Sequence, residues 1–498
     1  MKKKIMATAV ALMLGFSALA VGCSDDVQSD AVLLEEGKYF YTEKETPQTV
    51  NKLAFDFLGG DDVMPIGGFY GPYASGGSTN GFQFPDFVQE KYYKLLSDAG
   101  VNMVVYSKDN DSANKASILE SLELGEEYGV GYFVSSSELD ALAGRSTTYQ
   151  TGDELPFDLD TLADKMQEFS QYDSFLGMHV VDEPFWQQMD GLTKAYTLMD
   201  EIGYSSYPLF SNALGYSVTD FVRGGYQTNI TADQYYDELF NRVGFNFLSA
   251  TGYYYTEKDT SDEDLSMMFS DLSALWQLSK EYNVPLWRML QAGGQWNDAA
   301  EEIESVDPYP NEAEVLFDVN IALAYGCKAI QYFPLIQPLH FAYAPDGTYD
   351  FNRSGLLSAA GGVTQWYHYA QKANKQVKAV DHVLMNAESM GLIVHGDKAK
   401  ALALVGSTSN RADIISSGTF RQLQRVSGDD CFIGCFDYFG GTALYVVNYS
   451  RTEKAHVALE FDNYYGYDIT QRAQTASVMG NAFDLVLEAG EGALITLR

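Results

Sequence analysis

Basic residues are scarce in this chain. Its 498 residues include 32 Lys and Arg against 68 Asp and Glu, which gives a formal net charge of −36 at pH 7. A surface with this excess of negative charge repels phosphate backbones and anionic lipid headgroups. The composition therefore argues against nucleic-acid binding and against binding to anionic membrane surfaces, and it favours an uncharged partner.

Cysteine and histidine are also scarce, with four and six residues. Cys431 and Cys435 lie on a predicted strand, where residues four apart are separated by roughly 13 Å and cannot form a disulfide. Cys327 lies alone in an apolar segment, so all three are expected to be small buried side chains. The histidines form no HExxH motif and no paired-ligand spacing. We therefore predict no metal and no cofactor.

Long apolar runs and nucleotide-binding motifs are absent after the first 23 residues. No later run is long enough to span a bilayer, so we expect the body of the chain to be soluble. The sequence has no GxGxxG between a strand and a helix, no P-loop and no GxSxG elbow. These absences argue against dinucleotide binding, nucleotide hydrolysis by a P-loop and catalysis by a nucleophilic serine.

The first 23 residues, MKKKIMATAVALMLGFSALAVGC, form a distinct segment. They have a basic start, an apolar run too short for a membrane span, and small residues before Cys23. The end of the segment, Ala20-Val21-Gly22-Cys23, resembles the bacterial lipobox. This resemblance implies cleavage before Cys23 and lipidation of its thiol. Residues 24–58 are then a tether and lead-in.

The lipobox resemblance also implies a location. A lipidated Cys23 would hold the protein at the cell surface, on the outer face of the cytoplasmic membrane, or make it a periplasmic or outer-membrane lipoprotein in a Gram-negative cell. The membrane would be contacted through this anchor alone. An ordinary signal peptide remains the alternative.

Strand and helix patterns alternate eight times over about 300 residues. Each apolar strand ends in small, polar or aromatic residues and is followed by an amphipathic helix. This alternation predicts a (β/α)8 TIM barrel over residues 59–385, and the lack of GxGxxG disfavours an open doubly wound sheet. The predicted strands cover residues 63–70, 101–106, 131–135, 176–181, 207–212, 245–255, 284–291 and 328–333.

The pattern changes after about residue 385. Short alternating strands, separated by Gly, Asn, Asp and Ser, include KALALVG at 400–406, TALYVVNYS at 442–450 and GALITL at 492–497. This pattern predicts a C-terminal all-β sandwich over residues 386–498, packed behind the barrel.

The most informative stretch is FLGMHVVDEPFW, residues 175–186. A buried strand ends there in Asp182 and Glu183, and Pro184 prevents a regular strand from continuing. In a barrel of this type the active site lies at the carboxyl ends of the strands. We therefore expect both carboxylates in the cleft, and we expect His179 before them to be a satisfied interior histidine.

The other predicted strand ends are rich in aromatic and amide side chains. Aromatic faces stack on sugar rings, and amides form hydrogen bonds with hydroxyl groups, so this lining predicts a carbohydrate ligand. The residues expected to bind it are Tyr70, Tyr106, Trp186, Asn212, Tyr253, Gln291, Trp296 and Tyr332.

Two segments carry a resemblance to a known family. The Asp182-Glu183-Pro184 turn resembles the Asn-Glu-Pro turn of retaining (β/α)8 glycosidases, the clan that includes the β-galactosidases. NEAEVLFDVNIALAYGCKAIQYF at 311–333, with LQAGGQW at 290–296 before it, is similar to bacterial proteins of β-galactosidase-like barrel type. The likeness covers roughly residues 60–380. It implies that Glu183 protonates the glycosidic oxygen and later activates water. A surface-loop acid is the alternative for Glu183.

The seventh strand departs from the family pattern. The family's nucleophilic Glu should end this strand, but the chain has Gln291 and Gln295 there and no acid before Asp298. A glutamine cannot attack an anomeric carbon as a carboxylate does. Asp182 also departs from the family, which has Asn at this position.

Three hypotheses remain open for the second catalytic group. A carboxylate from another loop, Glu257, Glu138 or Asp298, is one source, and its separation from Glu183 would predict retention or inversion. Alternatively, Asp182 and Glu183 form a pair that resembles the pair of substrate-assisted hexosaminidases, in which the substrate's acetamido group is the nucleophile. In the third hypothesis the cleft binds sugar without cleaving it.

The sequence as a whole predicts an extracellular glycoside hydrolase that cleaves O-glycosidic bonds of a neutral glycan, with Glu183 and Asp182 as the catalytic residues. One alternative is a non-catalytic carbohydrate-binding surface lipoprotein with a degenerate glycosidase barrel. Another is a structural or adhesion component that uses the sandwich.

Overall fold

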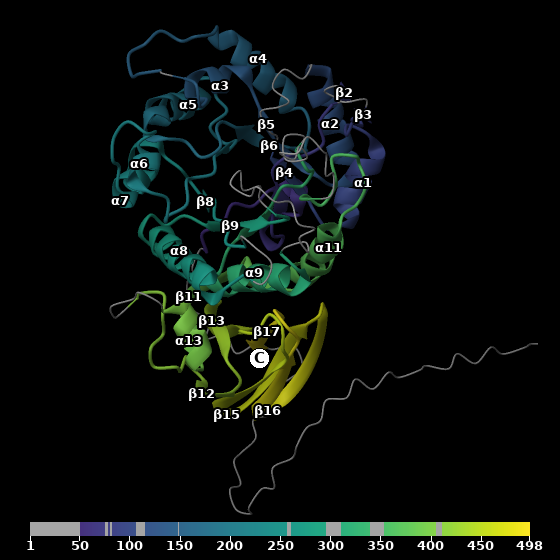
Figure 1. Ribbon diagram of the computed structural model, residues 1–498, viewed down its shortest axis with the longest axis vertical. Helices are drawn as coiled ribbons and strands as arrows, with labels where there is room; N and C mark the ends of the chain where they lie inside the picture. The colour runs from purple at the N-terminus through teal and green to yellow at the C-terminus, as the bar shows by residue number, and fades with distance from the viewer. Residues whose placement is uncertain are drawn as a thin grey trace, which may run out of the picture.

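The structure, a computed structural model of the chain, describes residues 50–74, 78–79, 82–105, 115–147, 149–255, 260–294, 310–338, 353–404 and 411–498. These residues form a barrel of strands and helices, and an antiparallel sheet that lies against one side of the barrel (Figure 1). Cys23 and the predicted leader lie outside the described residues. Within those residues, no helix combines the length and the apolar character needed to cross a bilayer.

Eight parallel strands close the barrel in chain order. Two four-stranded sheets, β4-β5-β6-β7 and β1-β10-β9-β8, meet through parallel bridges of Phe69 with Val105 and of Ala213 with Ala250. The predicted (β/α)8 fold is therefore confirmed. The strands are β1 (Ile66–Gly68), β4 (Met103–Val105), β5 (Gly131–Ser135), β6 (Phe175–His179), β7 (Leu209–Phe210), β8 (Leu248–Ala250), β9 (Leu286–Gln291) and β10 (Ala329–Phe333). A two-stranded hairpin, β2 (Ser78–Thr79) and β3 (Phe82–Gln83), follows β1.

Helices surround the barrel and begin and end where the sequence provides caps. The Asn311 side chain accepts hydrogen bonds from the backbone at the start of α9, and Gly326 ends α9 in a left-handed conformation. Thr231 caps α7, which continues as a π-helix over Glu238–Val243. The helices are α1 (Glu90–Asp98), α2 (Lys115–Tyr128), α3 (Ser137–Ala143), α4 (Leu159–Phe169), α5 (Met189–Glu201), α6 (Asp220–Arg223), α7 (Ala232–Asp237), α8 (Asp262–Glu281), α9 (Glu312–Tyr325), α11 (Gln365–Val377) and α12 (Asp381–Leu384).

Aromatic side chains form a buried cluster inside the barrel. The Phe247 ring packs at a tilt against Trp287 at 4.6 Å and against Phe210 at 5.4 Å between ring centroids. Phe55, from the segment before β1, lies 5.9 Å from Phe133 and belongs to the same buried cluster. The lead-in therefore covers the amino-terminal ends of the barrel strands. A functional site is then expected at their carboxyl ends.

The C-terminal domain is one antiparallel sheet of seven strands. Its order is β11-β13-β14-β17-β15-β12, with β16 paired to β15. The first part of β15 pairs with β12 and its last part pairs with β17, so the sheet folds over a core of its own. The predicted all-β C-terminal domain is confirmed. The strands are β11 (Ala387–His395), β12 (Leu423–Gly428), β13 (Cys431–Tyr438), β14 (Gly441–Asn448), β15 (Ala455–Gln471), β16 (Gln474–Leu487) and β17 (Gly492–Leu497).

One predicted strand of this domain is wrong. KALALVG overlaps helix α13 (Asp397–Ala403), which buries Ala399, Leu402 and Ala403. Ala, Lys and Leu are strong helix formers, and the three buried residues have the spacing of one helical face. The three cysteines outside the leader are free and buried, as predicted, and burial raises the pKa of Cys327 to about 12.

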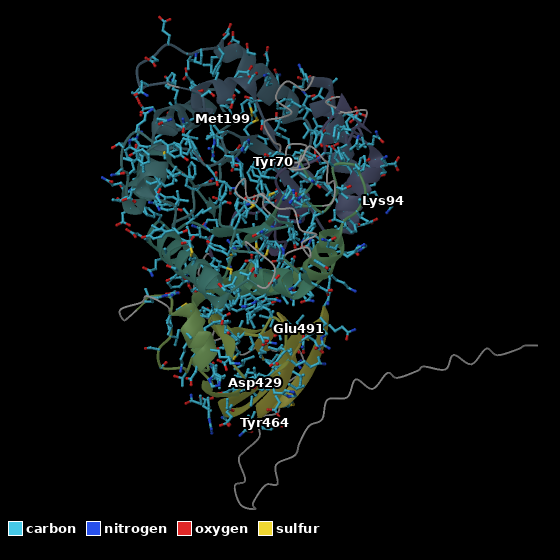
Figure 2. The ribbon with its side chains drawn as sticks, viewed as in Figure 1. Tyr70, Lys94, Met199, Asp429, Tyr464 and Glu491 are labelled. Atoms are coloured by element: carbon cyan, nitrogen blue, oxygen red, sulfur yellow. The ribbon has the colours of Figure 1, made fainter. Side chains whose placement is uncertain are left out.

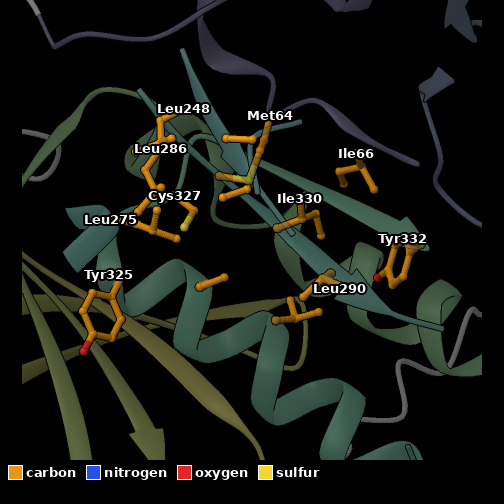
Figure 3. Packing of buried hydrophobic residues seen from close by; sticks show 14 of the residues in the cluster. Met64, Ile66, Leu248, Leu275, Leu286, Leu290, Tyr325, Cys327, Ile330 and Tyr332 are labelled. Carbon is orange, nitrogen blue, oxygen red and sulfur yellow. The ribbon is translucent and has the colours of Figure 1, made fainter. Parts of the chain in front are cut away.

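Helix α9 lies between the barrel and the sheet. All its residues from Glu314 to Tyr325 are buried, because one face packs on the strands and the other on β13 and β14. Gly434 allows this approach, since a Cβ there would lie 2.2 Å from the Ala324 carbonyl oxygen. Figure 3 shows part of the layer, with Leu286 and Ile330 on the strands and Tyr325 at the end of α9.

Candidate active site

Glu183 lies in a tightly held turn just beyond the carboxyl end of β6. Its backbone has φ = +49°, a left-handed conformation that residues other than Gly adopt only at a cost. The Glu183 N–H donates to the Asn212 carbonyl oxygen at 2.9 Å, and the Tyr235 hydroxyl donates to the Pro184 carbonyl oxygen at 2.8 Å. Such strain persists where the surroundings hold it, and it is concentrated at functional sites.

Two donors orient the Glu183 carboxylate. The Thr251 hydroxyl donates to Oε1 at 2.6 Å, and Arg145 Nη2 donates to Oε2 at 3.0 Å. Arg145 also donates to the carbonyl oxygens of Asp182 and Glu183, and its guanidinium stacks 4.7 Å above the Phe185 ring centroid. The Glu183 side chain remains 28% exposed. The carboxylate is therefore fixed in position and accessible to a ligand.

Aromatic rings lie beside the acidic pair at the mouth of the barrel. The Phe333 ring packs against Tyr253 at 5.2 Å and against Tyr70 at 5.6 Å between centroids. Tyr70 lies near the centre of the barrel in the view of Figure 2, and its backbone is left-handed, with φ = +57°. Burial, and then the charges of Asp182 and Glu183, raise the pKa of Tyr253 well above its usual value. Tyr253 therefore keeps its phenolic proton as a hydrogen-bond donor.

A buried polar layer supports the mouth from below. Gln331 Nε2 donates to the Ser249 hydroxyl at 2.8 Å, and that hydroxyl donates to Asn212 Oδ1. His179 forms a 3.0 Å hydrogen bond with the Ser135 hydroxyl through Nδ1, and its ring lies 5.6 Å from that of Phe69. His179 is thus a buried interior histidine, as predicted. Asn212 is buried too, and its carbonyl oxygen holds Glu183.

Gln291, at the end of β9, is engaged by backbone groups. Its Nε2 donates to the carbonyl oxygens of Tyr255 at 2.6 Å and Gly293 at 3.0 Å, and its Oε1 accepts from the Tyr255 N–H at 3.1 Å. The side chain therefore joins the segment after β8 to the segment after β9. The predicted role of Gln291 in sugar binding finds no support in this placement.

Glu138, one candidate for the second carboxylate, is already paired. Its oxygens accept from Lys165 Nζ at 2.5 and 2.7 Å, and the side chain is buried. Burial acts to raise the pKa of Glu138, but the hydrogen bonds and charge of Lys165 outweigh it, and the pKa is lowered. Glu257 and Asp298, the other two candidates, lie outside the described residues.

The remaining predicted residues are scattered. Trp186 begins a short 3-10 helix directly after the turn and is half-buried against the core. Tyr332 points away from the mouth, because it is buried on the outer side of β10 and its hydroxyl donates to Asn374 Oδ1 on α11 at 2.8 Å. Tyr106 and Trp296 lie outside the described residues.

Arg145 and Thr251 are site residues that the sequence did not predict. Thr251 lies two residues after Ser249 within the predicted strand 245–255, so the alternation of that predicted strand would place both side chains on one face. Arg145 comes from the loop after α3 and has no comparable signal. In the described ranges, no three acidic, histidine or cysteine side chains converge as metal ligands would.

No family model matches this chain, and no curated protein matches it in sequence. Its fold is similar to several solved structures. A β-galactosidase from the psychrophilic Marinomonas ef1 is 11% identical with a TM-score of 0.47, and the match covers 87% of this chain and 100% of that one. The GH51 arabinofuranosidase from Xanthomonas axonopodis pv. citri is 10% identical with a TM-score of 0.44, covering 90% and 98%.

A third similar structure is that of a GH27 β-L-arabinopyranosidase from Geobacillus stearothermophilus. It is 10% identical with a TM-score of 0.46, and the match covers 90% of this chain and 99% of that one.

Proposed function

We propose that this protein is a glycoside hydrolase in which Glu183 is the general acid and base. The observation that carries the proposal is the Glu183 carboxylate, fixed by Thr251 and Arg145 at the carboxyl end of a barrel strand and still accessible. Enzymes of this architecture have their sites at that end of the barrel.

The surroundings of Glu183 suit a neutral sugar. The rings of Tyr70, Tyr253 and Phe333 supply flat apolar faces beside the acidic pair, and the Tyr253 hydroxyl supplies a donor. The net charge of −36 disfavours a polyanionic glycan.

In a retaining or substrate-assisted reaction, Glu183 takes part in two proton transfers. When it carries a proton, Glu183 donates that proton to the glycosidic oxygen as the bond to the anomeric carbon breaks. The second carboxylate, or the acetamido oxygen of the substrate, bonds to the anomeric carbon as the leaving group departs, and the Glu183 carboxylate then accepts a proton from the water that displaces this bond. Thr251 and Arg145 hold the carboxylate oxygens in place throughout.

The second catalytic group comes from one of two sources. Asp182 is adjacent to Glu183 and suits a substrate-assisted mechanism, in which it orients the 2-acetamido group of the sugar. Alternatively, Glu257 or Asp298 supplies the carboxylate. Activity confined to 2-acetamido glycosides, and lost in Asp182→Asn, would assign Asp182; cleavage of 2-hydroxy glycosides would assign a carboxylate from another loop.

The test of the proposed function is the variant Glu183→Gln. We expect a panel of 4-nitrophenyl α- and β-glycosides and soluble polysaccharides to contain a substrate for the wild-type protein. The variant should lower kcat on that substrate by about 10²- to 10⁴-fold, because general acid–base catalysis contributes that much. The matched control is Glu201→Gln, an exposed acid at the end of α5. Full activity in Glu183→Gln would contradict the proposal.

The hydrogen bonds of the Gln291 side chain with backbone groups favour one alternative function, sugar binding without hydrolysis. No carboxylate stands at the end of β9 through Gly294, so a sugar-binding protein without hydrolysis is the second candidate. It predicts that the wild-type protein and Glu183→Gln bind the same glycan, and that neither releases reducing ends from it.

We also propose that Cys23 is lipidated and anchors the protein at the cell surface. The support is the run Ala20-Val21-Gly22-Cys23 after a short apolar segment. Metabolic labelling with a palmitate analogue should label the wild-type protein and leave Cys23→Ala unlabelled, and the variant should be lost from the membrane fraction. Labelling of Cys23→Ala would contradict the proposal.

A further inference from the structure

Exposed aromatic rings lie beside the mouth of the barrel. Phe221 on α6 is 49% exposed and Tyr226 is 60% exposed, and their ring centroids lie 5.7 Å apart in an edge-to-face arrangement. The Tyr226 ring lies 5.9 Å from that of Phe185, two residues after Glu183. Phe185, Phe221 and Tyr226 are called the aromatic platform below.

Arg145 connects the aromatic platform to the catalytic acid. Its guanidinium stacks 4.7 Å above the Phe185 ring centroid, while its Nη2 lies 3.0 Å from Glu183 Oε2. Direct contacts therefore lead from the Glu183 carboxylate through Arg145 to the three rings of the platform. A linear glycan bound at Glu183 would reach the platform within a few sugar residues.

The segment that carries Phe221 and Tyr226 is held in one conformation. The Tyr226 N–H donates to the Phe221 carbonyl oxygen at 3.0 Å, and the backbone of Tyr226 is left-handed, with φ = +62°. The Gln187 side chain covers Gly225, where a Cβ would lie 2.1 Å from its Oε1. Arg223 is buried and pairs with Asp220 at 2.9 Å. The rings are therefore exposed on a rigid support, as a preorganised binding surface requires.

An exposed group of aromatic rings marks an interaction site, because leaving large apolar faces in water is unfavourable. Flat rings stack on the apolar faces of sugars, and continuity with Glu183 points to the same ligand. We propose that the aromatic platform is a second sugar-binding subsite, which holds a neutral sugar residue of the glycan whose bond is cleaved at Glu183. This inference rests on the proposed function, and it identifies the substrate as an oligosaccharide or polysaccharide.

The test measures binding in a background that cannot consume the glycan. Full-length Glu183→Gln is run in native gels that contain soluble xylan, galactomannan, arabinogalactan or mixed-linkage β-glucan, and Kd is obtained from the retardation. Phe221→Ala and Tyr226→Asn are then added together, since Asn tolerates the left-handed backbone at 226. We expect Kd to rise about tenfold, the effect of losing two stacking contacts. Tyr226→Phe, which keeps the ring, should retain the binding of Glu183→Gln.

The chain offers a matched control on the C-terminal sheet. Phe439 has a left-handed backbone and is 48% exposed, and Tyr464, labelled in Figure 2, is 58% exposed. Phe439→Asn with Tyr464→Ala removes two comparable rings far from Glu183 and should leave Kd unchanged. Thermal melting of every variant checks that the fold is intact.

The outcomes separate the subsite from the hydrolase. Equal retardation with and without the platform substitutions overturns the subsite, and so does a lack of retardation by all four polysaccharides. A monomer–dimer equilibrium that the substitutions abolish, seen by sedimentation, also overturns it, because a second copy then covers the rings. If binding depends on the platform but the wild-type protein releases no reducing ends, the sugar-binding subsite is supported. In that case only the proposed hydrolysis is contradicted.

Discussion

Glu183 combines a strained backbone with a fully oriented side chain. A left-handed conformation at a residue other than Gly costs on the order of 1–3 kcal/mol. Here Asn212 after β7, Thr251 after β8 and Tyr235 on α7 hold the turn and the side chain of Glu183. The sequence predicted the position of this acid because Pro184 prevents a regular strand from continuing beyond it, although β6 itself ends earlier, at His179. It did not predict the partners, because Arg145 and Thr251 come from other parts of the barrel.

The hydroxyl of Thr251 is expected to act as a positioning group for Glu183. Thr251→Val keeps the shape of the side chain and removes the donor to Oε1. A hydrogen bond to a charged group contributes about 1.5–3 kcal/mol, so kcat/KM should fall roughly 10- to 100-fold on the substrate found in the glycoside panel. Steady-state kinetics of the variant measure this loss.

Two further variants test whether the hydroxyl itself is responsible. Thr251→Ser restores the donor and should recover most of the activity, which a purely structural role of the methyl group would not allow. Thr193→Val on α5, where the hydroxyl donates to the Met189 carbonyl oxygen, is the matched control. Wild-type kinetics in Thr251→Val would contradict the positioning role.

At the scale of elements, Lys328 ties the start of β10 to the junction between α12 and β11. Its Nζ donates to the carbonyl oxygens of Leu384 and, at 2.6 Å, of Ala387. The side chain is buried, and burial lowers the pKa of Lys328 to about 7. A neutral amine has two N–H groups, and they match the two carbonyl oxygens.

The pKa of Lys328 predicts how stability depends on pH. Between about pH 7 and the ordinary lysine value near 10.4, the unfolded chain binds a proton that the folded chain has released. The free energy of unfolding should therefore rise with pH across this window, by up to about 5 kcal/mol relative to Lys328→Met. Below pH 7 both states are protonated and the difference between the two proteins should be flat.

Urea unfolding followed by tryptophan fluorescence at pH 6.5, 8 and 9.5 measures this difference. Lys94→Met is a suitable control, because the Lys94 ammonium is exposed on α1 and pairs with Asp98. A difference between wild type and Lys328→Met that stays constant across the three pH values would show that Lys328 remains charged in the folded protein.

Element types were predictable where the pattern is local. All eight barrel strands overlap the ranges that the alternation predicted. Four strands, β1, β4, β7 and β8, are half their predicted length or shorter, and β8 covers only Leu248–Ala250 within the predicted 245–255. Beyond Ala250 the chain leaves the strand to place Thr251 and Tyr253 at the mouth, and its apolar composition does not reveal that turn.

At the scale of the whole molecule, the C-terminal sheet supports the barrel through α9. The Tyr445 hydroxyl donates to Asn320 Oδ1 at 2.7 Å, and Asn320 Nδ2 donates to the Gly490 carbonyl oxygen at 2.8 Å. A helix that is apolar on all sides needs cover on both faces, and the sheet provides the second one. The sheet lies on the side of the barrel (Figure 1).

The sequence by itself determined the barrel, the C-terminal β domain and the acid at the end of the fourth barrel strand. These features depend on local periodicity, on helix caps and on the effect of one proline, all of which can be recognised within a few residues. Only the tertiary structure decided that Arg145 and Thr251 hold Glu183, that Gln291 is engaged by backbone, that Tyr332 faces outward and that the aromatic platform lies beside the mouth. Those contacts join residues from separate strands and loops. Closure of the barrel and the left-handed turns bring these residues into contact.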